Sequence, residues 1–232
     1  MGKDATAHGM DGTLVEPDWP ALTFDEVRAL LKQFPHCGEP IRILSWSPRP
    51  FSAASVVATK AENVFIKRHH RAVRDREGLL EEHRFIAHLY AKGAGVPRVL
   101  ASASGETAIE NGQWTYEVHE TPKGVDLYED ALSWTPFRSA AHAYSAGRAL
   151  AKLHLSAHEF GAPPRKPRPL VASFSIFAAN DPSIAMKQYL AERPALDTDG
   201  ATHIRCENAL ELLAPFHAEL RPFLSALTPL WT

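Results

Sequence analysis

Residues 63–89 read NVFIKRHHRAVRDREGLLEEHRFIAHL and place a strand directly before a helix. The apolar run at the start of this stretch contains β-branched and aromatic residues, which predicts a strand over Val64–Arg68. Lys67 closes the apolar part of that strand. A single lysine at this position is either an ordinary strand-end residue whose ammonium reaches water, or a ligand-binding cation.

The second half of the same stretch has the periodicity of a helix. Five residues share one face at the i, i+3, i+4, i+7 spacing, which predicts a helix over Asp75–Lys92: Leu79, Glu82, Phe85, Ile86 and Leu89. Glu82 stands between apolar residues on that face, so we expect it to point inward. The neighbouring Glu81 suits a solvated position better.

Strands are predicted on both sides of this unit. Two precede it, over Ile41–Trp46 and Ser55–Thr59, and a helix opened by Thr23 precedes these. Three follow, over Val99–Ala101, Thr107–Glu110 and Trp114–His119, the last two joined by Asn111-Gly112, a strong hairpin signal.

Beyond residue 122 the pattern becomes helical. Helices are predicted over residues 139–157, 182–191, 201–213 and 215–226, the last starting at a proline. The first of them has a face of small residues that also includes His154, and we expect this face to be packed. The fold class is therefore α+β, with a flexible lead-in over residues 1–22, a strand-rich lobe over 23–120 and a helical lobe over 121–232.

Composition argues for an ordinary globular protein. The 232 residues are 45% hydrophobic and 22% charged, with a net charge of −2, so neither a nucleic acid nor a membrane surface is expected as a partner. Cys37 and Cys206 have no metal-type spacing and are interpreted as unreactive thiols in a reduced, cytoplasmic setting. The basic residues between Arg68 and Arg76 are interpreted as a solvated connection.

The order of these elements fits the requirements of phosphoryl transfer from ATP. That chemistry needs a turn over the phosphates, a lysine on the third strand, a glutamate on the next helix, and a linker whose backbone binds adenine. The loop Pro48–Ser55 supplies the turn, with Phe51, Ser52 and Ala53 as its candidate contacts. Lys67 and Glu82 supply the ion pair. The linker candidates follow the last strand of the lobe: Val118, His119 and Glu120.

Five segments together resemble the phosphotransferase family that includes aminoglycoside and choline kinases. They are VFIK at 64–67, EEHRFIAHL at 81–89, GVPRVLAS at 95–102, TYEVHETPKGVDLY at 115–128 and GRALAKLH at 147–154. The resemblance spans about Ile41 to His158. It implies a bilobal protein-kinase-like fold, ATP and Mg²⁺ as cofactors, and a small molecule with a hydroxyl group as acceptor. Lys67 matches the family's phosphate-contacting lysine, and Glu82 its ion-pair partner, with Glu81 as the second choice.

Two departures from the family pattern limit what is expected of this chain. The loop PRPFSAAS contains no glycine, and no histidine in the sequence is followed two residues later by aspartate, as the family's catalytic loop requires. The last six residues resemble the strand that leads into that loop. We therefore expect a chain truncated before the loop, without activity and without a metal ligand of its own, which still binds nucleotide weakly.

The acceptor stays open among sugars, aminoglycosides, choline-like alcohols and homoserine. The alternative function is a non-catalytic, kinase-like binding or regulatory module. Because a truncated lobe leaves apolar surface exposed, self-association is also expected.

Overall fold

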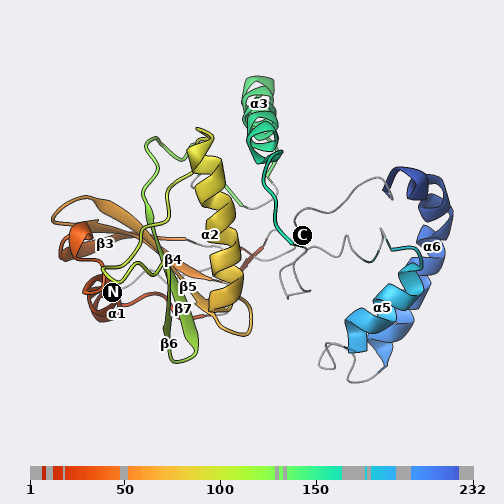
Figure 1. The fold of residues 1–232 in the computed structure, drawn as a ribbon, viewed down its shortest axis with the longest axis horizontal. Coiled ribbons are helices and arrows are strands. Elements are labelled where there is room, and N and C mark those ends of the chain that lie inside the picture. Colours follow the sequence, from red (N-terminus) through yellow and green to blue (C-terminus); the bar gives the residue numbers. More distant parts are fainter. Residues whose placement is uncertain are drawn as a thin grey trace. The chain divides into compact units, whose positions relative to one another are not determined.

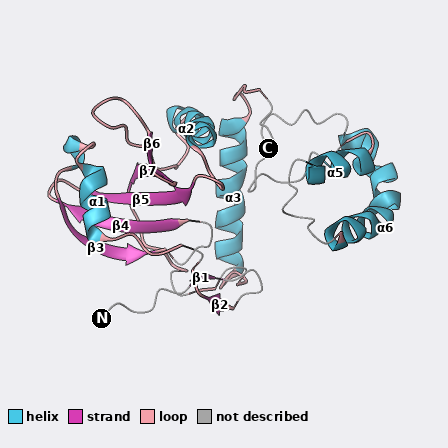
Figure 2. Cartoon of the chain, turned by 90° about the horizontal axis from the view of Figure 1, so that it is seen from below, coloured by secondary structure: helices cyan, strands magenta, loops and turns pink. Residues whose placement is uncertain are grey.

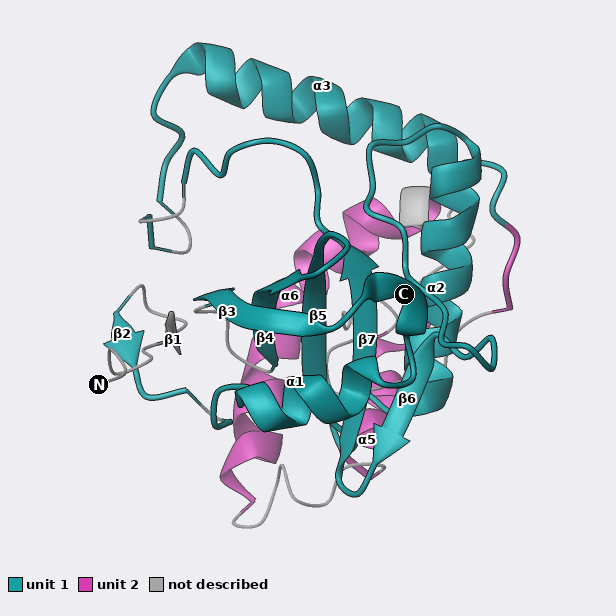
Figure 3. Cartoon of the chain, turned by 90° about the vertical axis from the view of Figure 1, so that its left-hand side faces the viewer, with its two compact units in different colours: residues 1–160 teal, residues 161–232 magenta. Residues whose placement is uncertain are grey.

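The computed structural model describes residues 7–8, 13–17, 19–47, 52–128, 131–132, 135–163, 176, 179–191 and 200–224. The chain divides into two compact units, residues 1–160 and 161–232 (Figure 3). The division falls after Phe160, whereas the sequence placed a boundary at residue 120. The reason for the difference is that the first long helix after the sheet makes its contacts with the first unit.

A five-stranded antiparallel sheet forms the centre of the first unit (Figure 2). Its spatial order is β3 (Pro40–Trp46), β4 (Ala53–Thr59), β5 (Asn63–His70), β7 (Trp114–Glu120) and β6 (Ala108–Asn111). The five strands confirm five of the six predictions. The sixth, over Val99–Ala101, is reduced to a single bridge between Val99 and His119.

Helices α1 (Phe24–Leu31) and α2 (Arg76–Ala91) lie against opposite faces of this sheet (Figure 1). Side chains alternate between the two faces along a strand. Arg68 of β5 therefore points to one face, where it binds Glu26 of α1. Lys67 and His69 point to the other face, which α2 covers.

The hydrophobic core lies between α1 and the sheet. Its fully buried members include Val27 of α1, Phe34, and three strand residues, Val57, Ile66 and Val118. A capping box at Thr23 and Glu26 begins α1, as predicted. After α1 a 3-10 helix, η1 (Pro35–Cys37), buries Cys37, and burial raises the pKa of its thiol to about 11. The thiol therefore stays protonated at neutral pH, which agrees with the predicted lack of reactivity.

The C-terminal part of the segment before α1 contacts the sheet. Strands β1 (Ala7–His8) and β2 (Leu14–Val15) pair with each other. Trp19 stacks on His70 with 4.9 Å between ring centroids, and Leu22 is buried. The lead-in expected to be flexible through residue 22 is thus packed against the sheet from Trp19 onward.

Helix α3 (Ala140–Ala157) contacts α2 near its C-terminal end. Nε2 of His88 lies 2.9 Å from the carbonyl oxygen of Ser156, and Phe85 meets Phe160 with 4.9 Å between ring centroids. Along α3, all of which is described, no residue is buried, and His154 is exposed. The prediction that one face of α3 is packed is wrong within this unit, because α2 contacts only the C-terminal end of α3.

The second unit contains α5 (Pro182–Ala191) and α6 (Ala201–Leu224). α6 runs through Pro215, where the sequence predicted a break between two helices. A proline inside a helix removes one backbone hydrogen bond and crowds the carbonyl four residues earlier, which is why a break was predicted there. Among the described helices none is both long and apolar enough to cross a membrane.

Candidate active site

Lys67 lies at the centre of the sheet face that α2 covers. In the strand register it stands between Ala54 of β4 and Glu117 of β7. Its Nζ lies 2.8 Å from Oε1 of Glu117. The lysine side chain is 27% exposed and the glutamate side chain 2%, so a buried carboxylate holds an ammonium that solutes can still reach.

Three imidazole rings surround the same carboxylate. Nε2 of His69 lies 2.9 Å from Oε1, and Nε2 of His83 lies 2.9 Å from Oε2. Nε2 of His119 is also 2.9 Å from Oε2, but it is not aligned for a hydrogen bond. β5, β7 and α2 thus each contribute a ring to one buried charge.

These contacts decide the ionisation of Glu117. Burial, the largest influence, raises the pKa of Glu117. The opposing interactions with His119, His69, His83 and Lys67 together hold the pKa well below its ordinary value of 4.5. Burial lowers the pKa of His69 from 6.5 despite its hydrogen bond to Glu117. At neutral pH the carboxylate is therefore ionised and His69 is neutral.

The predicted ion pair between Lys67 and Glu82 is not the one in the structure. Glu82 pairs with Arg74, in the connection before α2, and its side chain is 21% exposed. The buried residues of α2 include Leu79 and His83, four positions apart, so the inward face passes through His83. Glu82 is one residue away from it, about 100° around the helix.

Sequence reasoning missed Glu117, His69 and His83 as members of this site. The cross-strand position of Glu117 depends on a register between β5 and β7, which lie more than forty residues apart in sequence. One signal was available. Glu117 is a charged residue inside the otherwise uncharged run Trp114–Val118, a position where an unpaired charge would be costly.

The predicted phosphate turn is described only in part. Phe51 lies outside the described residues. Ser52 is partly exposed and precedes β4, while Ala53 belongs to β4 and is buried in the core facing α1. Ala53 was expected in the turn, but its pairing with Arg68 of β5 extends the strand to include it.

The backbone of the predicted adenine linker is already hydrogen-bonded. The Val118 carbonyl accepts from the N–H of Leu100 at 2.7 Å, and the Glu120 N–H donates to the Arg98 carbonyl at 3.0 Å. His119 is buried beside Glu117. The Arg98–Leu100 segment therefore occupies backbone groups that the sequence assigned to adenine.

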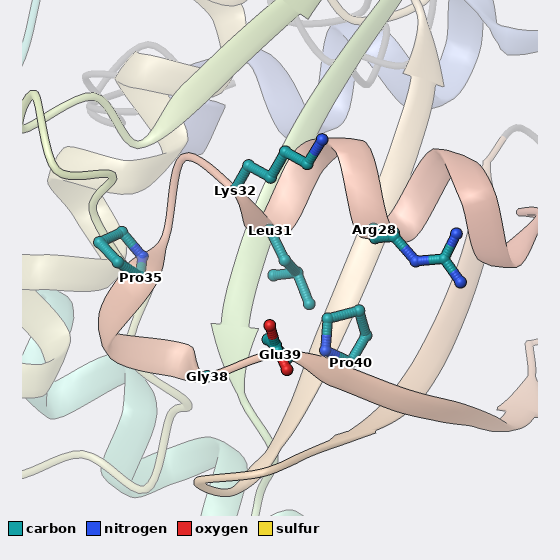
Figure 4. A pocket seen from close by; sticks show the side chains of 7 residues that line it. All are labelled: Arg28, Leu31, Lys32, Pro35, Gly38, Glu39 and Pro40. Carbon is teal, nitrogen blue, oxygen red and sulfur yellow. The ribbon is translucent and has the colours of Figure 1, made fainter.

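A separate pocket of about 460 Å³ opens between α1, η1 and β3 (Figure 4). Leu31 points toward Pro40 at its centre, and Arg28, Lys32, Pro35, Gly38 and Glu39 complete its lining. The pocket lies beside α1, whereas Lys67 faces α2. It therefore does not belong to the site around Lys67.

Within the described part of the chain, no group of three or more His, Cys, Asp or Glu side chains is arranged to hold a metal ion. The Glu117 cluster consists of direct carboxylate–imidazole and carboxylate–ammonium contacts. Its chemistry is that of a lysine held in place by a buried, ionised carboxylate.

Comparisons with known structures give distant similarities. An amicoumacin kinase, solved with AMP-PNP and Ca²⁺, shares 14% identity at a TM-score of 0.46, over 67% of this chain and 48% of its own. A spectinomycin phosphotransferase, solved with ADP and spectinomycin, shares 11% identity at a TM-score of 0.43, over 77% and 55%. The chain spans about half the length of these structures. No curated protein matches it.

The family comparison covers most of the chain. The model described as the phosphotransferase enzyme family matches residues 49–229. The match includes β4, β5, α2 and β7, and hence both Lys67 and Glu117. The chain therefore belongs to the phosphotransferase enzyme family.

Proposed function

We propose that the protein binds ATP with Mg²⁺ and serves the transfer of the γ-phosphoryl group to a hydroxyl of a small molecule. The observation that carries this proposal is Lys67, whose ammonium is held at 2.8 Å by a buried carboxylate while its side chain is 27% exposed. Family membership supports the reaction class.

Lys67 suits a triphosphate for an electrostatic reason. A partly exposed ammonium can form charge-assisted hydrogen bonds with phosphate oxygens while one of its N–H groups stays bound to Glu117. The residue opposite Lys67 on β4 is the small Ala54. Ser52, which directly precedes β4, would contribute a hydroxyl or backbone N–H to the phosphates.

No residue of this sequence is assigned to the later chemistry. Its sequence has no His-x-Asp motif, so no aspartate is assigned as the base for the acceptor hydroxyl. Within the described residues none is assigned to Mg²⁺, which would enter with the nucleotide. We therefore expect these 232 residues to bind ATP–Mg²⁺ without transferring phosphate, which is also the behaviour of a non-catalytic nucleotide-binding module.

The test is calorimetric titration of the chain with ATP–Mg²⁺, beside Lys67→Ala and Lys60→Ala. Lys60 is a matched control, because it is an exposed lysine in the turn directly after β4 and pairs with Glu39. We expect Lys67→Ala to weaken binding by about tenfold or more, since it removes a charge-assisted contact, and Lys60→Ala to change it by less than about twofold. Equal effects of the two substitutions, or no binding by the unmodified chain, would contradict the proposal.

A further inference from the structure

The carboxylate that contacts Lys67 comes from a strand. Lys67 and Glu117 are directly opposite residues of two antiparallel strands. Side chains at such positions start close together on the same face, so the 2.8 Å contact follows from the register of β5 and β7. Its geometry does not require α2 to occupy a particular position.

The second oxygen of Glu117 connects this pair to α2. Oε2 lies 2.9 Å from Nε2 of His83, and Nδ1 of His83 lies 2.8 Å from the hydroxyl of Thr107. Because Glu117 is ionised, Nε2 must carry the proton and donate to it. With Nε2 as the donor, Nδ1 is placed to accept from the Thr107 hydroxyl, and this tautomer satisfies all three groups.

The helix carboxylate is engaged elsewhere. Glu82 pairs with Arg74, and both side chains are more than a fifth exposed. The α2 residue that contacts the sheet here is His83, whose side chain is 5% exposed. The contact between α2 and the lysine site thus passes through an imidazole and then through Glu117.

We infer that Glu117, and not Glu82, is the residue that positions Lys67, and that His83 ties this ion pair to α2. As far as nucleotide binding is concerned, the inference rests on the proposed function. Glu117 is a positioning residue, because it acts on the phosphates through Lys67. Without it, the long lysine side chain loses the contact that selects one of its rotamers.

The first experiment compares two equivalent substitutions, Glu117→Gln and Glu82→Gln. Each removes one negative charge and keeps the size of the side chain. By calorimetry with ATP–Mg²⁺ we expect Glu117→Gln to weaken binding about tenfold and Glu82→Gln less than about twofold. In a Lys67→Ala background, Glu117→Gln should have no further effect, because its target is gone. A general structural role would instead weaken binding equally in both backgrounds.

Two results of this experiment would overturn the inference while leaving the proposed function intact. One is Lys67-dependent binding that Glu117→Gln leaves unchanged. The other is a larger loss with Glu82→Gln than with Glu117→Gln. His83→Asn gives a further check, since its effect on affinity should disappear in the Glu117→Gln background.

A second experiment tests the ion pair without nucleotide, so that failure of the proposed function does not affect it. Urea unfolding of Lys67→Met, Glu117→Gln and the double variant forms a cycle, for which we expect a coupling of about tenfold in the unfolding equilibrium constant. The equivalent cycle of Lys67→Met with Glu82→Gln should be additive. Coupling to Glu82 and none to Glu117 would overturn the inference.

Because Glu117 is buried, the Glu117→Gln variant could fail to fold. Substitutions of Lys67, the other member of the ion pair, test the inference without changing Glu117. Lys67→Met should raise the unfolding equilibrium constant about tenfold more than the matched Lys60→Met does, because it leaves a buried carboxylate without its ammonium. Lys67→Arg should restore most of the loss. Equal stability of the Lys67→Met and Lys60→Met variants would contradict the assignment of Glu117.

Discussion

Lys67 and Glu117 face each other across β5 and β7, with 2.8 Å between Nζ and Oε1. The two charges balance within one cluster, in which the carboxylate is buried and the ammonium is partly accessible. A phosphate bound by this lysine would therefore approach a cation whose position the sheet already determines. This arrangement joins the fold to the proposed chemistry, because the same register that builds the sheet places the cation.

The first prediction concerns the loss of folding stability at acidic pH. The pKa of His69 is lowered from 6.5, so below pH 6.5 the unfolded chain takes up a proton at this residue that the folded chain does not. Folding stability should therefore decrease as pH falls through this range, by up to about 1.4 kcal/mol per pH unit for one group. The pKa of Glu117 is held below 4.5, which adds a second loss of the same sign below that pH.

Thermal unfolding at several pH values between 7.5 and 5.5 measures the first of these losses. His69→Gln removes the titrating ring and keeps a side-chain N–H that can donate to Glu117. Its melting temperature should change less over this interval than that of the unmodified protein. Parallel curves for the two proteins would mean that His69 is not responsible.

The second prediction concerns the ion pair between α1 and the sheet. NH1 of Arg68 lies 2.8 and 2.9 Å from the two Glu26 oxygens, and the guanidinium lies 4.2 Å above the Trp114 ring. The Tyr116 hydroxyl donates to the same carboxylate at 2.6 Å. Arg68 is 4% exposed, so Arg68→Met should cost about 3 kcal/mol by leaving Glu26 without its cation.

Chemical denaturation gives this free energy of unfolding directly. Arg28→Met serves as the comparison, because Arg28 pairs with Asp25 at side-chain exposures of 54% and 88%. An exposed pair of this kind contributes at most about 1 kcal/mol. Similar costs for the two variants would show that the Arg68 pair is no stronger than a surface contact.

Local sequence signals were sufficient for most of the fold. The strand predicted over Val64–Arg68 is β5 (Asn63–His70), and the helix predicted over Asp75–Lys92 is α2 (Arg76–Ala91). The strand follows from its β-branched and aromatic residues, and the helix from its periodicity, so both depend only on the segment itself. Predictions that depended on distant partners were less successful, as the unpacked face of α3 and the continuous α6 show.

The site shows the same distinction. Lys67 was identified from its place at the end of an apolar strand, which is local information. The prediction of Glu82 assumed that a glutamate between apolar residues points inward, but a helix turns by about 100° per residue and His83 takes that position. The role of Glu117 follows from a pairing of two strands, and a single sequence without alignment does not contain that register.

The third prediction concerns the start of α1. The Thr23 hydroxyl accepts from the N–H of Glu26 at 3.2 Å, in the capping box. Thr23→Ala removes this acceptor and should cost about 1 kcal/mol, whereas Thr23→Ser keeps a hydroxyl and should cost only a few tenths. Denaturant titration of the two variants checks the difference, and equal stabilities would show that the cap contributes nothing.

The fourth prediction concerns Gly38, which joins η1 to β3 with φ +76° and ψ 172°. This backbone conformation is essentially restricted to glycine. A Cβ at this position would also lie 2.9 Å from the backbone nitrogen of Ala61, in the turn between β4 and β5. Gly38→Ala should therefore cost about 3 kcal/mol, since backbone strain and a steric clash add.

Gly93→Ala is the comparison variant without a steric clash. Gly93 has a similar φ of +75°, but an added Cβ would meet nothing within 4 Å. Strain alone should cost this variant about 1 kcal/mol. The difference between the two free energies of unfolding then measures the contact with Ala61 together with the extra strain of the Gly38 conformation. If both variants lose the same stability, the turn moves away from the new methyl group and the packing of β4–β5 against η1 is looser than the structure indicates.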